Sequence, residues 1–331
     1  MSYNPSLFTP PPNSNEDEET HIRENFNPLF FQDGNIILKS QNVGIRVHRS
    51  VLEMHSRTLK TIFENNPTCP ADSRSPPTLF IDVTDWDLVH YINAVYNRSR
   101  DYFMVRPQAF DITASLIRSS RVLHNDFLRV NTIKRLHNEY PTKIANWDSI
   151  KNSEFTRICK VPGLHIEVVH LGRSEHLYTI LPAALYRICK QYDMDTICDG
   201  VLCIDDRRAV LSLEDKLLCG RAKEKLYYAQ GEMTHGWIFD GSIPVASCPR
   251  LGKCEAAKNE VKQDVVGIMP RIRALDKWPQ RWNDKFCRRC ELMAKRMHQT
   301  GRIRVWDALP GIFDFVSWND LRLLEEQKVY L

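Results

Sequence analysis

The hydrophobic pattern of residues 36–96 alternates between strand and helix periods, and this limits the folds open to the chain. NIILKS and GIRVH are short, β-rich segments joined by the polar turn QNVG, which predicts a hairpin. The next run predicts two short helices divided by Ser56 as an N-cap, with Val51, Leu52, Leu59, Ile62 and Phe63 at helical spacing. TLFIDV predicts a buried strand. DWDLVHYINAVY predicts a helix capped by Thr84, and the side chains expected to face inward are Trp86, Val89, Ile92 and Tyr96. The expected fold class is therefore α/β (α+β), in the order hairpin, helices, strand, helix.

Five residues in this order also carry a family resemblance: Asp33, His48, Arg49, Leu52 and Ser56. They resemble the start of a BTB/POZ domain, most closely in the BTB proteins that are numerous in fungi. The resemblance implies a BTB/POZ domain over 28–142, in which Asp33 and Arg49 form a charged pair near the dimer groove. Residues 1–27 are rich in proline and acidic residues, and we expect a disordered tail there.

Residues 143–331 have helical patterning almost throughout. LSLEDKLLCGRAKEKLYYAQ begins with Ser212 as a predicted cap and Asp215 three residues later, and Leu217, Leu218, Ala222 and Leu226 are expected to face inward. Several stretches resemble the C-terminal region of the same fungal proteins, for which the resemblance implies no activity. We therefore expect a mostly α-helical C-terminal region.

The histidines do not indicate an enzyme. His48 and His55 are seven residues apart, yet they lack the convergent partners of a site. We therefore expect the His48 ring to satisfy backbone groups at a strand-to-helix corner. His165 and Glu167 do not have the spacing of the zinc-hydrolase motif. The sequence has no nucleophile elbow, phosphate-binding glycine loop or kinase signature. We expect no catalytic and no cofactor-binding residues.

Two cysteine pairs in the C-terminal region suggest a structural metal. They are Cys248 with Cys254 and Cys287 with Cys290, and four thiolates from two pairs can close a tetrahedral zinc site. If residues 284–297 are helical, Cys287 and Cys290 share one face. The alternative is that all four are buried as small apolar side chains.

Charge is unevenly distributed. The net charge is +4 over 331 residues, whereas residues 250–304 hold 15 Lys/Arg against 6 Asp/Glu. A nucleic-acid interface is one interpretation. The favoured one is a solvated helical face that meets an acidic partner, because Trp278, Trp282 and Phe286 have the spacing of a core stripe.

The function implied by the resemblance is protein–protein interaction. BTB domains typically form homodimers, and some bind a cullin as adaptors of ubiquitin ligases, so we expect a scaffold or adaptor that binds itself and a further protein partner. The alternative is a transcription-associated regulator that contacts nucleic acid through the basic, cysteine-paired region. No signal peptide or membrane span is predicted, so we expect an intracellular protein of the cytoplasm or nucleus.

Overall fold

The computed structural model describes residues 30–65, 76–96, 107–150, 155–267 and 271–329. The chain forms two compact units: unit 1 comprises 1–135 and 156–159, and unit 2 comprises 136–155 and 160–331. The protein is mostly helical, at 63%, with a small mixed sheet, so the α+β class predicted from the sequence is confirmed. The predicted boundary after residue 142 and the predicted tail over 1–27 stay predictions, and the tail lies outside the described residues.

Unit 1 contains a three-stranded mixed sheet in the order β2-β1-β3. Strands β1 (Ile36–Lys39) and β2 (Gly44–Val47) form the predicted hairpin, with Ile36 opposite Val47. Strand β3 (Thr78–Phe80) pairs with β1 in parallel. The side chains on one face alternate into the core, as expected for a sheet covered on one side; they are Ile36, Leu38, Ile45, Val47 and Leu79.

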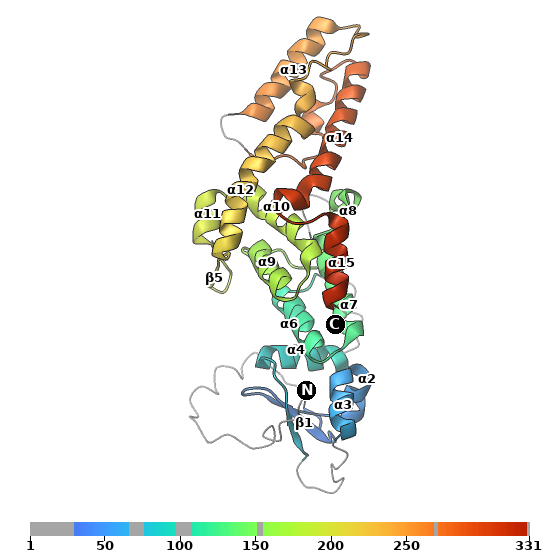
Figure 1. Ribbon diagram of the computed structural model, residues 1–331, viewed down its shortest axis with the longest axis vertical. Coiled ribbons are helices and arrows are strands. Elements are labelled where there is room, and N and C mark those ends of the chain that lie inside the picture. Colours follow the sequence, from blue (N-terminus) through green and yellow to red (C-terminus); the bar gives the residue numbers. More distant parts are fainter. Residues whose placement is uncertain (1–29, 66–75, 97–106, 151–154, 268–270, 330–331) are drawn as a thin grey trace. The chain divides into compact units, whose positions relative to one another are not determined.

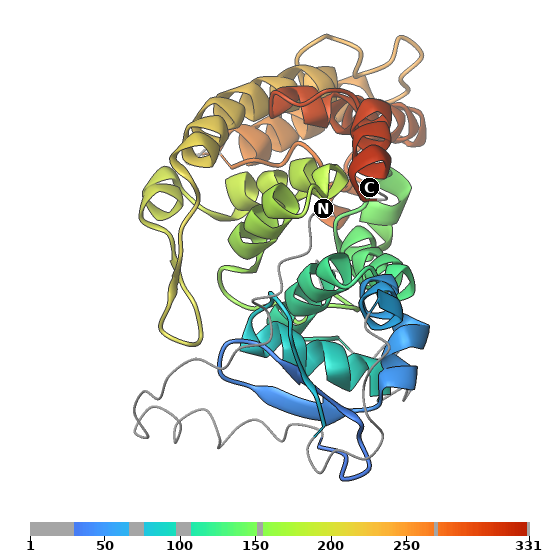
Figure 2. The same cartoon turned by 60° about the horizontal axis from the view of Figure 1, so that its bottom comes forward.

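The helices of unit 1 begin at the predicted caps. The Ser56 hydroxyl accepts a hydrogen bond from the backbone N–H of Leu59 at 3.0 Å, separating α2 (Arg49–His55) from α3 (Arg57–Asn65). The Thr84 hydroxyl accepts one from Asp87 at the start of α4 (Asp85–Tyr96), which packs against α6 (Phe110–Val122). Helix α7 (Asp126–Glu139) follows. Figure 2 shows the sheet and these helices.

Unit 2 is built from helices, as expected, with one short hairpin that the sequence did not reveal (Figure 1). The hairpin joins β4 (Val201–Leu202) to β5 (Arg208–Ala209). The helices are α8 (Ile144–Ser149), α9 (Leu164–Ser174), α10 (Leu181–Gln191), α11 (Met194–Asp199), α12 (Leu213–Ala229), α13 (Leu251–Val266), α14 (Arg288–Ile312) and α15 (Trp318–Val329). Shorter helical turns are η3 (Tyr178–Ile180), η4 (Gln230–Thr234), η5 (Gly236–Ile238) and η6 (Gln280–Trp282).

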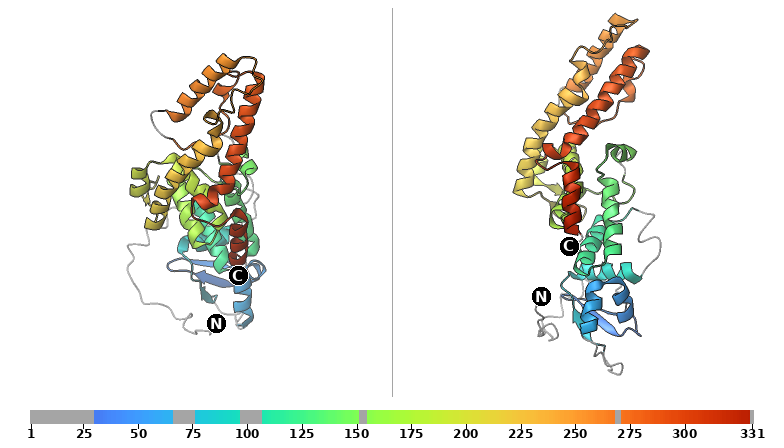
Figure 3. Two further views of the ribbon diagram at one scale, coloured as in Figure 1. Left: turned by 45° about the horizontal axis from the view of Figure 1, so that its top comes forward. Right: turned by 45° about the vertical axis from the view of Figure 1, so that its right-hand side comes forward.

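Helix α14 packs closely against the π-helical turn η4, which continues α12 (Figure 3). A Cβ atom at Gly301 would lie 1.9 Å from the backbone oxygen of Met233, so only glycine allows this approach. Ser212 caps α12 as predicted, accepting from the N–H of Asp215 at 3.1 Å. Two inward predictions are wrong, because Leu217 is 56% exposed and Trp86 is 40% exposed.

Among the described residues, no helix combines the length and the apolar character needed to cross a membrane.

Candidate metal centre

The four cysteines of the two predicted pairs come from the starts of two helices. Cys248 lies in the loop before α13 and Cys254 in the first turn of that helix. Cys287 is the N-cap residue of α14, and Cys290 lies in its first turn. Two helix N-termini therefore meet at the cluster, and their positive ends favour the thiolate form of cysteine.

The sulfur atoms lie at distances that suit one tetrahedral ion. All four Sγ atoms are within 4.8 Å of one another, and those of Cys248 and Cys287 are 3.7 Å apart. A zinc ion with Zn–S bonds of about 2.3 Å places its four sulfurs about 3.8 Å apart, by tetrahedral geometry. The small contraction needed is within side-chain movement, so the four thiols can hold a single metal ion.

Backbone N–H groups already point at the sulfurs. The Sγ of Cys290 accepts from Val245 at 3.4 Å, that of Cys248 from Arg250 at 3.4 Å, and that of Cys254 from Cys287 at 3.2 Å. Such hydrogen bonds stabilise negative charge on a sulfur and orient it. Three of the four sulfurs therefore already have a backbone donor that would stabilise a thiolate.

The surroundings shift the pKa values of the three buried thiols in different directions. Cys254, Cys287 and Cys290 are buried, and Cys248 is half-buried. Burial raises the pKa of Cys290 to about 12, and it also raises the pKa of Cys254. Burial would raise the pKa of Cys287 too, but hydrogen bonds from the Cys290 backbone and from the neighbouring thiols outweigh it and lower that pKa to about 7. Without a metal, Cys287 is the thiol of this cluster with a pKa lowered toward neutrality.

The clustering predicted from the sequence is confirmed, but the predicted helical geometry is wrong. Cys287 has φ −67° and ψ 156°, an extended conformation, so α14 begins one residue later and the two cysteines do not share a helical face. The extended conformation is what turns the N–H of Cys287 toward Cys254. The N–H donors of Val245 and Arg250 were not identified from the sequence, because spacing of cysteines says nothing about the loop between them.

The predicted dimer-groove residues lie at the strand-to-helix corner of unit 1. Leu52 is fully buried, and the Ser56 hydroxyl also donates to the Leu123 carbonyl at 2.6 Å. His48 follows β2, and its ring contacts the Tyr96 hydroxyl through Nδ1 at 3.2 Å, where backbone partners were expected. His55 is half-buried and makes no site with His48.

The expected ion pair between Asp33 and Arg49 is wrong for this chain. The Asp33 side chain is 83% exposed and lies 3.2 Å from Nε2 of His48. Arg49 instead pairs with Glu53 at 2.7 Å, one turn along α2, and lies over the Phe63 ring. Glu53 lies four residues after Arg49 in α2, which is the spacing at which side chains of one helix meet, so the pair forms within the helix.

The other histidine candidate also serves the fold. His165 is buried on α9, and its Nδ1 lies 2.7 Å from the Tyr140 hydroxyl. His170 is exposed on the same helix. No carboxylate joins them among the described residues, so the two histidines and Glu167 are not gathered into one site.

Comparisons of the chain with protein-family models, with curated proteins and with solved structures return no match.

Proposed function

We propose that the chain is a protein–protein interaction module, with a BTB/POZ domain over 28–142 that forms a homodimer and a helical region stapled by zinc. The observation that carries the first part is the mixed sheet order β2-β1-β3, with a helix pair between β2 and β3. That order agrees with the arrangement implied by the resemblance at Asp33, His48, Arg49, Leu52 and Ser56. The proposed role is that of a scaffold or an adaptor, with a cullin ubiquitin ligase as one candidate partner.

Exposed apolar side chains of unit 1 offer area that self-association would bury. Met54 is 72% exposed and Phe127 is 74% exposed. Single exposed apolar residues are common, so these two serve as positions to test rather than as an interface already located.

The test is analytical ultracentrifugation of the full chain at tens of micromolar, where a dimer of ordinary interface size persists. We expect a dimer, and we expect Met54→Glu or Phe127→Glu to weaken it if the interface covers that position. Leu217→Glu is the matched control, because Leu217 is also exposed but lies on α12 of unit 2. A monomer at every concentration contradicts self-association.

The second part of the proposal is that the cysteine cluster holds one zinc ion with a structural role. The observation that carries it is the mutual approach of four sulfurs within 4.8 Å. Four protein ligands leave no open position for a substrate, which is the arrangement of structural rather than catalytic zinc. Zinc has no redox chemistry, so its contribution here is to hold the starts of α13 and α14 together.

Cobalt substitution tests this assignment. Co²⁺ bound tetrahedrally by four thiolates absorbs strongly in the visible range, and zinc displaces it. We expect these bands in the full chain after exchange and their loss in Cys254→Ser. Cys198→Ser is the control, because Cys198 is an exposed cysteine outside the cluster. Absence of the bands in the unmodified chain contradicts the four-sulfur site.

A further inference from the structure

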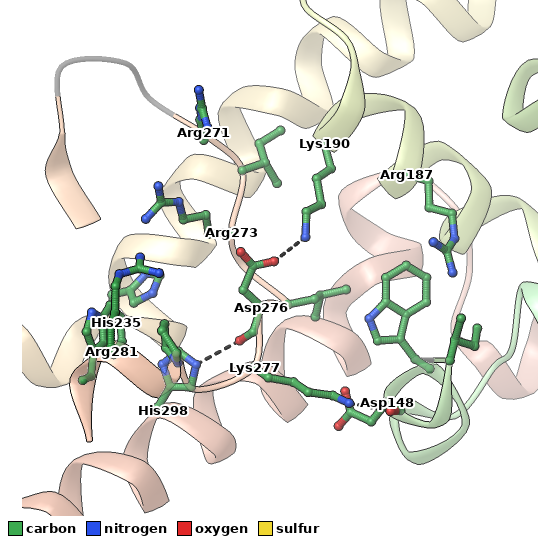
Figure 4. Close-up of a pocket in the computed structure, with 16 residues that line it drawn as sticks. Asp148, Arg187, Lys190, His235, Arg271, Arg273, Asp276, Lys277, Arg281 and His298 are labelled. Carbon is green, nitrogen blue, oxygen red and sulfur yellow. Dashed lines mark hydrogen bonds and ion pairs between the residues drawn. The ribbon is translucent and has the colours of Figure 1, made fainter. Parts of the chain in front are cut away.

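A pocket of about 680 Å³ lies within unit 2, away from the cysteine cluster (Figure 4). Its walls come from α8, α10, the residue that follows η4, the segment 271–277, η6 and the middle of α14. This volume falls in the range of pockets that bind small molecules. Six cationic side chains line it: Arg187, Lys190, Arg271, Arg273, Lys277 and Arg281.

The positive charge of this pocket is not balanced by its acidic residues. Asp276 pairs with Lys190, and Asp148 pairs with Arg302 at 2.5 Å. Asp264 pairs with Arg281 at 2.6 Å and lies 4.0 Å from Arg273. Among the residues that line the pocket, six cations face two carboxylates, Asp148 and Asp276, which is an excess of four positive charges.

The two histidines of the pocket add no further charge. Burial lowers the pKa of His235 to about 3 and also lowers the pKa of His298, so both rings are neutral at pH 7. The Nδ1 atom of each ring is buried and has no hydrogen-bond partner in the described part of the chain. Buried polar atoms without a partner are uncommon in folded proteins.

Arg187 is the most unusual cation of the set. It is 8% exposed, and its guanidinium lies 4.2 Å from the centre of the Trp147 ring and 4.8 Å from that of Phe155. Its Nε has no hydrogen-bond partner in the described part of the chain, and its Nη2 donates to the backbone carbonyl of Glu139 at 3.4 Å. Burial lowers the pKa of Arg187, and the nearby Glu139 carboxylate opposes that effect only in part. A bound anion would offset the remaining cost of burying this cation.

The arginine-bearing segment 271–277 is held rigidly, although it is neither helix nor strand. Gln230 of η4 binds the Arg271 carbonyl at 3.2 Å and accepts from the N–H of Arg273. Further side chains bind the backbone of 274–276; they are Thr234, Tyr186, Arg302 and His298. Figure 4 shows His298 contacting the carbonyl of Asp276 while Lys190 reaches its carboxylate.

This fixation determines which side chains face outward. Ile272, Ala274 and Leu275 are buried, whereas Arg271 and Lys277 are exposed and Arg273 is half-buried. A backbone that is already held in place lowers the entropic cost of binding an anion with the side chains that it carries. The pocket is therefore preorganised for negative charge.

We propose that this pocket binds a small organic molecule that carries two or more phosphate groups. Guanidinium groups match phosphate oxygens in a bidentate manner, and the excess of four charges exceeds what a single carboxylate neutralises. A concave site of this volume encloses a small ligand. A nucleic-acid backbone is instead contacted along an extended basic surface.

The test uses fructose 1,6-bisphosphate as the probe, titrated calorimetrically into the full chain at constant ionic strength. We expect saturable binding of one molecule per chain and none with unphosphorylated fructose. The double variant Arg271→Ala/Lys277→Ala should weaken binding about tenfold or more, since charge-assisted hydrogen bonds are lost. Both residues are exposed, so the variant is expected to fold. The single variant Arg271→Ala gives a second measurement of the loss of affinity.

The matched control is Lys253→Ala/Arg304→Ala, which removes the same charge from exposed positions that do not line the pocket. It should leave affinity within about twofold, because exposed charges at a distance are screened by salt. Equal weakening by both double variants, or no saturable binding, overturns the proposal. A short thymidine oligonucleotide that binds more tightly than the bisphosphate, and loses affinity in the pocket variant alone, replaces it with a nucleic-acid site.

Discussion

The core of unit 1 and the core around the cysteines differ in size and in residue composition. The first contains eighteen buried apolar residues drawn from the sheet and its helices, with Leu38, Leu52 and Leu59 fully buried. The second, which we call the cysteine region (residues 237–294), contains eleven, and three of these are cysteines. A core this small rarely stabilises a fold by itself, and small domains commonly add a metal or disulfides. On the proposed zinc assignment, we expect unit 1 to be held by apolar burial and the cysteine region to depend on its sulfur cluster.

Loss of the metal should give the largest effect, and only in one region. Cys290→Ser removes a buried ligand. We expect it to lower the free energy of unfolding of the cysteine region by more than about 5 kcal/mol, because structural zinc contributes folding free energy directly. Hydrogen exchange read by mass spectrometry should rise in peptides from 251–266 and 288–300 and stay unchanged in 36–63. A chelator should reproduce the pattern. Equal exchange in the variant and the unmodified chain contradicts a metal-dependent core.

The converse change is a cavity in unit 1. Leu52→Ala removes a fully buried side chain, and we expect a loss of about 2–5 kcal/mol in the free energy of unfolding of unit 1. Exchange should rise in 36–63 and not in 251–266, and chelator should add nothing in unit 1. Met54→Ala is the control, because that neighbour is 72% exposed. Increased exchange in the cysteine region would show that the two cores are not independent.

Acid should destabilise unit 2 by protonating a buried histidine as well as by protonating the cysteine thiolates. Burial lowers the pKa of His165 to about 3, whereas an unfolded histidine titrates near 6.5. Between these values the unfolded chain binds the extra proton, so stability falls as pH falls from about 6.5 toward 3, by on the order of 1 kcal/mol per pH unit. His165→Gln should be less stable at pH 7 and less sensitive to acid. Urea unfolding at pH 7 and pH 5 measures both, and identical pH slopes would contradict this role.

The smallest effect concerns the cap between α2 and α3. Ser56→Ala removes the hydrogen bond to the Leu59 N–H and leaves the Leu123 carbonyl without its donor. We expect the free energy of unfolding of unit 1 to fall by about 1–2 kcal/mol. The effect of a chelator on stability should not change. Ser50→Ala is the control, because Ser50 is exposed in the same helix. A melting temperature equal to that of the control would contradict the capping role.

Local patterns predicted the elements of unit 1 well because their signals are local. Ser56, Thr84 and Ser212 mark helix starts through hydrogen bonds within three residues, and the structure places all three as expected. Exposure depends on neighbours distant in sequence, which explains why Leu217 and Trp86 were wrongly expected to face inward.

The metal centre could be predicted in outline but not in detail. The spacing of the cysteines indicates two chelating pairs, yet the approach of the pairs depends on α13 and α14 meeting at their first turns. The basic pocket was visible only as excess charge over 250–304. Its rigidity comes from Gln230, Tyr186 and Arg302, which the chain pattern does not connect to 271–277.

Native mass spectrometry of the full chain, purified without chelator, tests the central claim most directly. We predict a mass increase of one zinc ion per chain, retained in Cys198→Ser and lost in Cys290→Ser. Well under one zinc per chain, with hydrogen exchange over 251–266 unchanged by chelator, would contradict the account and leave the four cysteines as apolar members of the core.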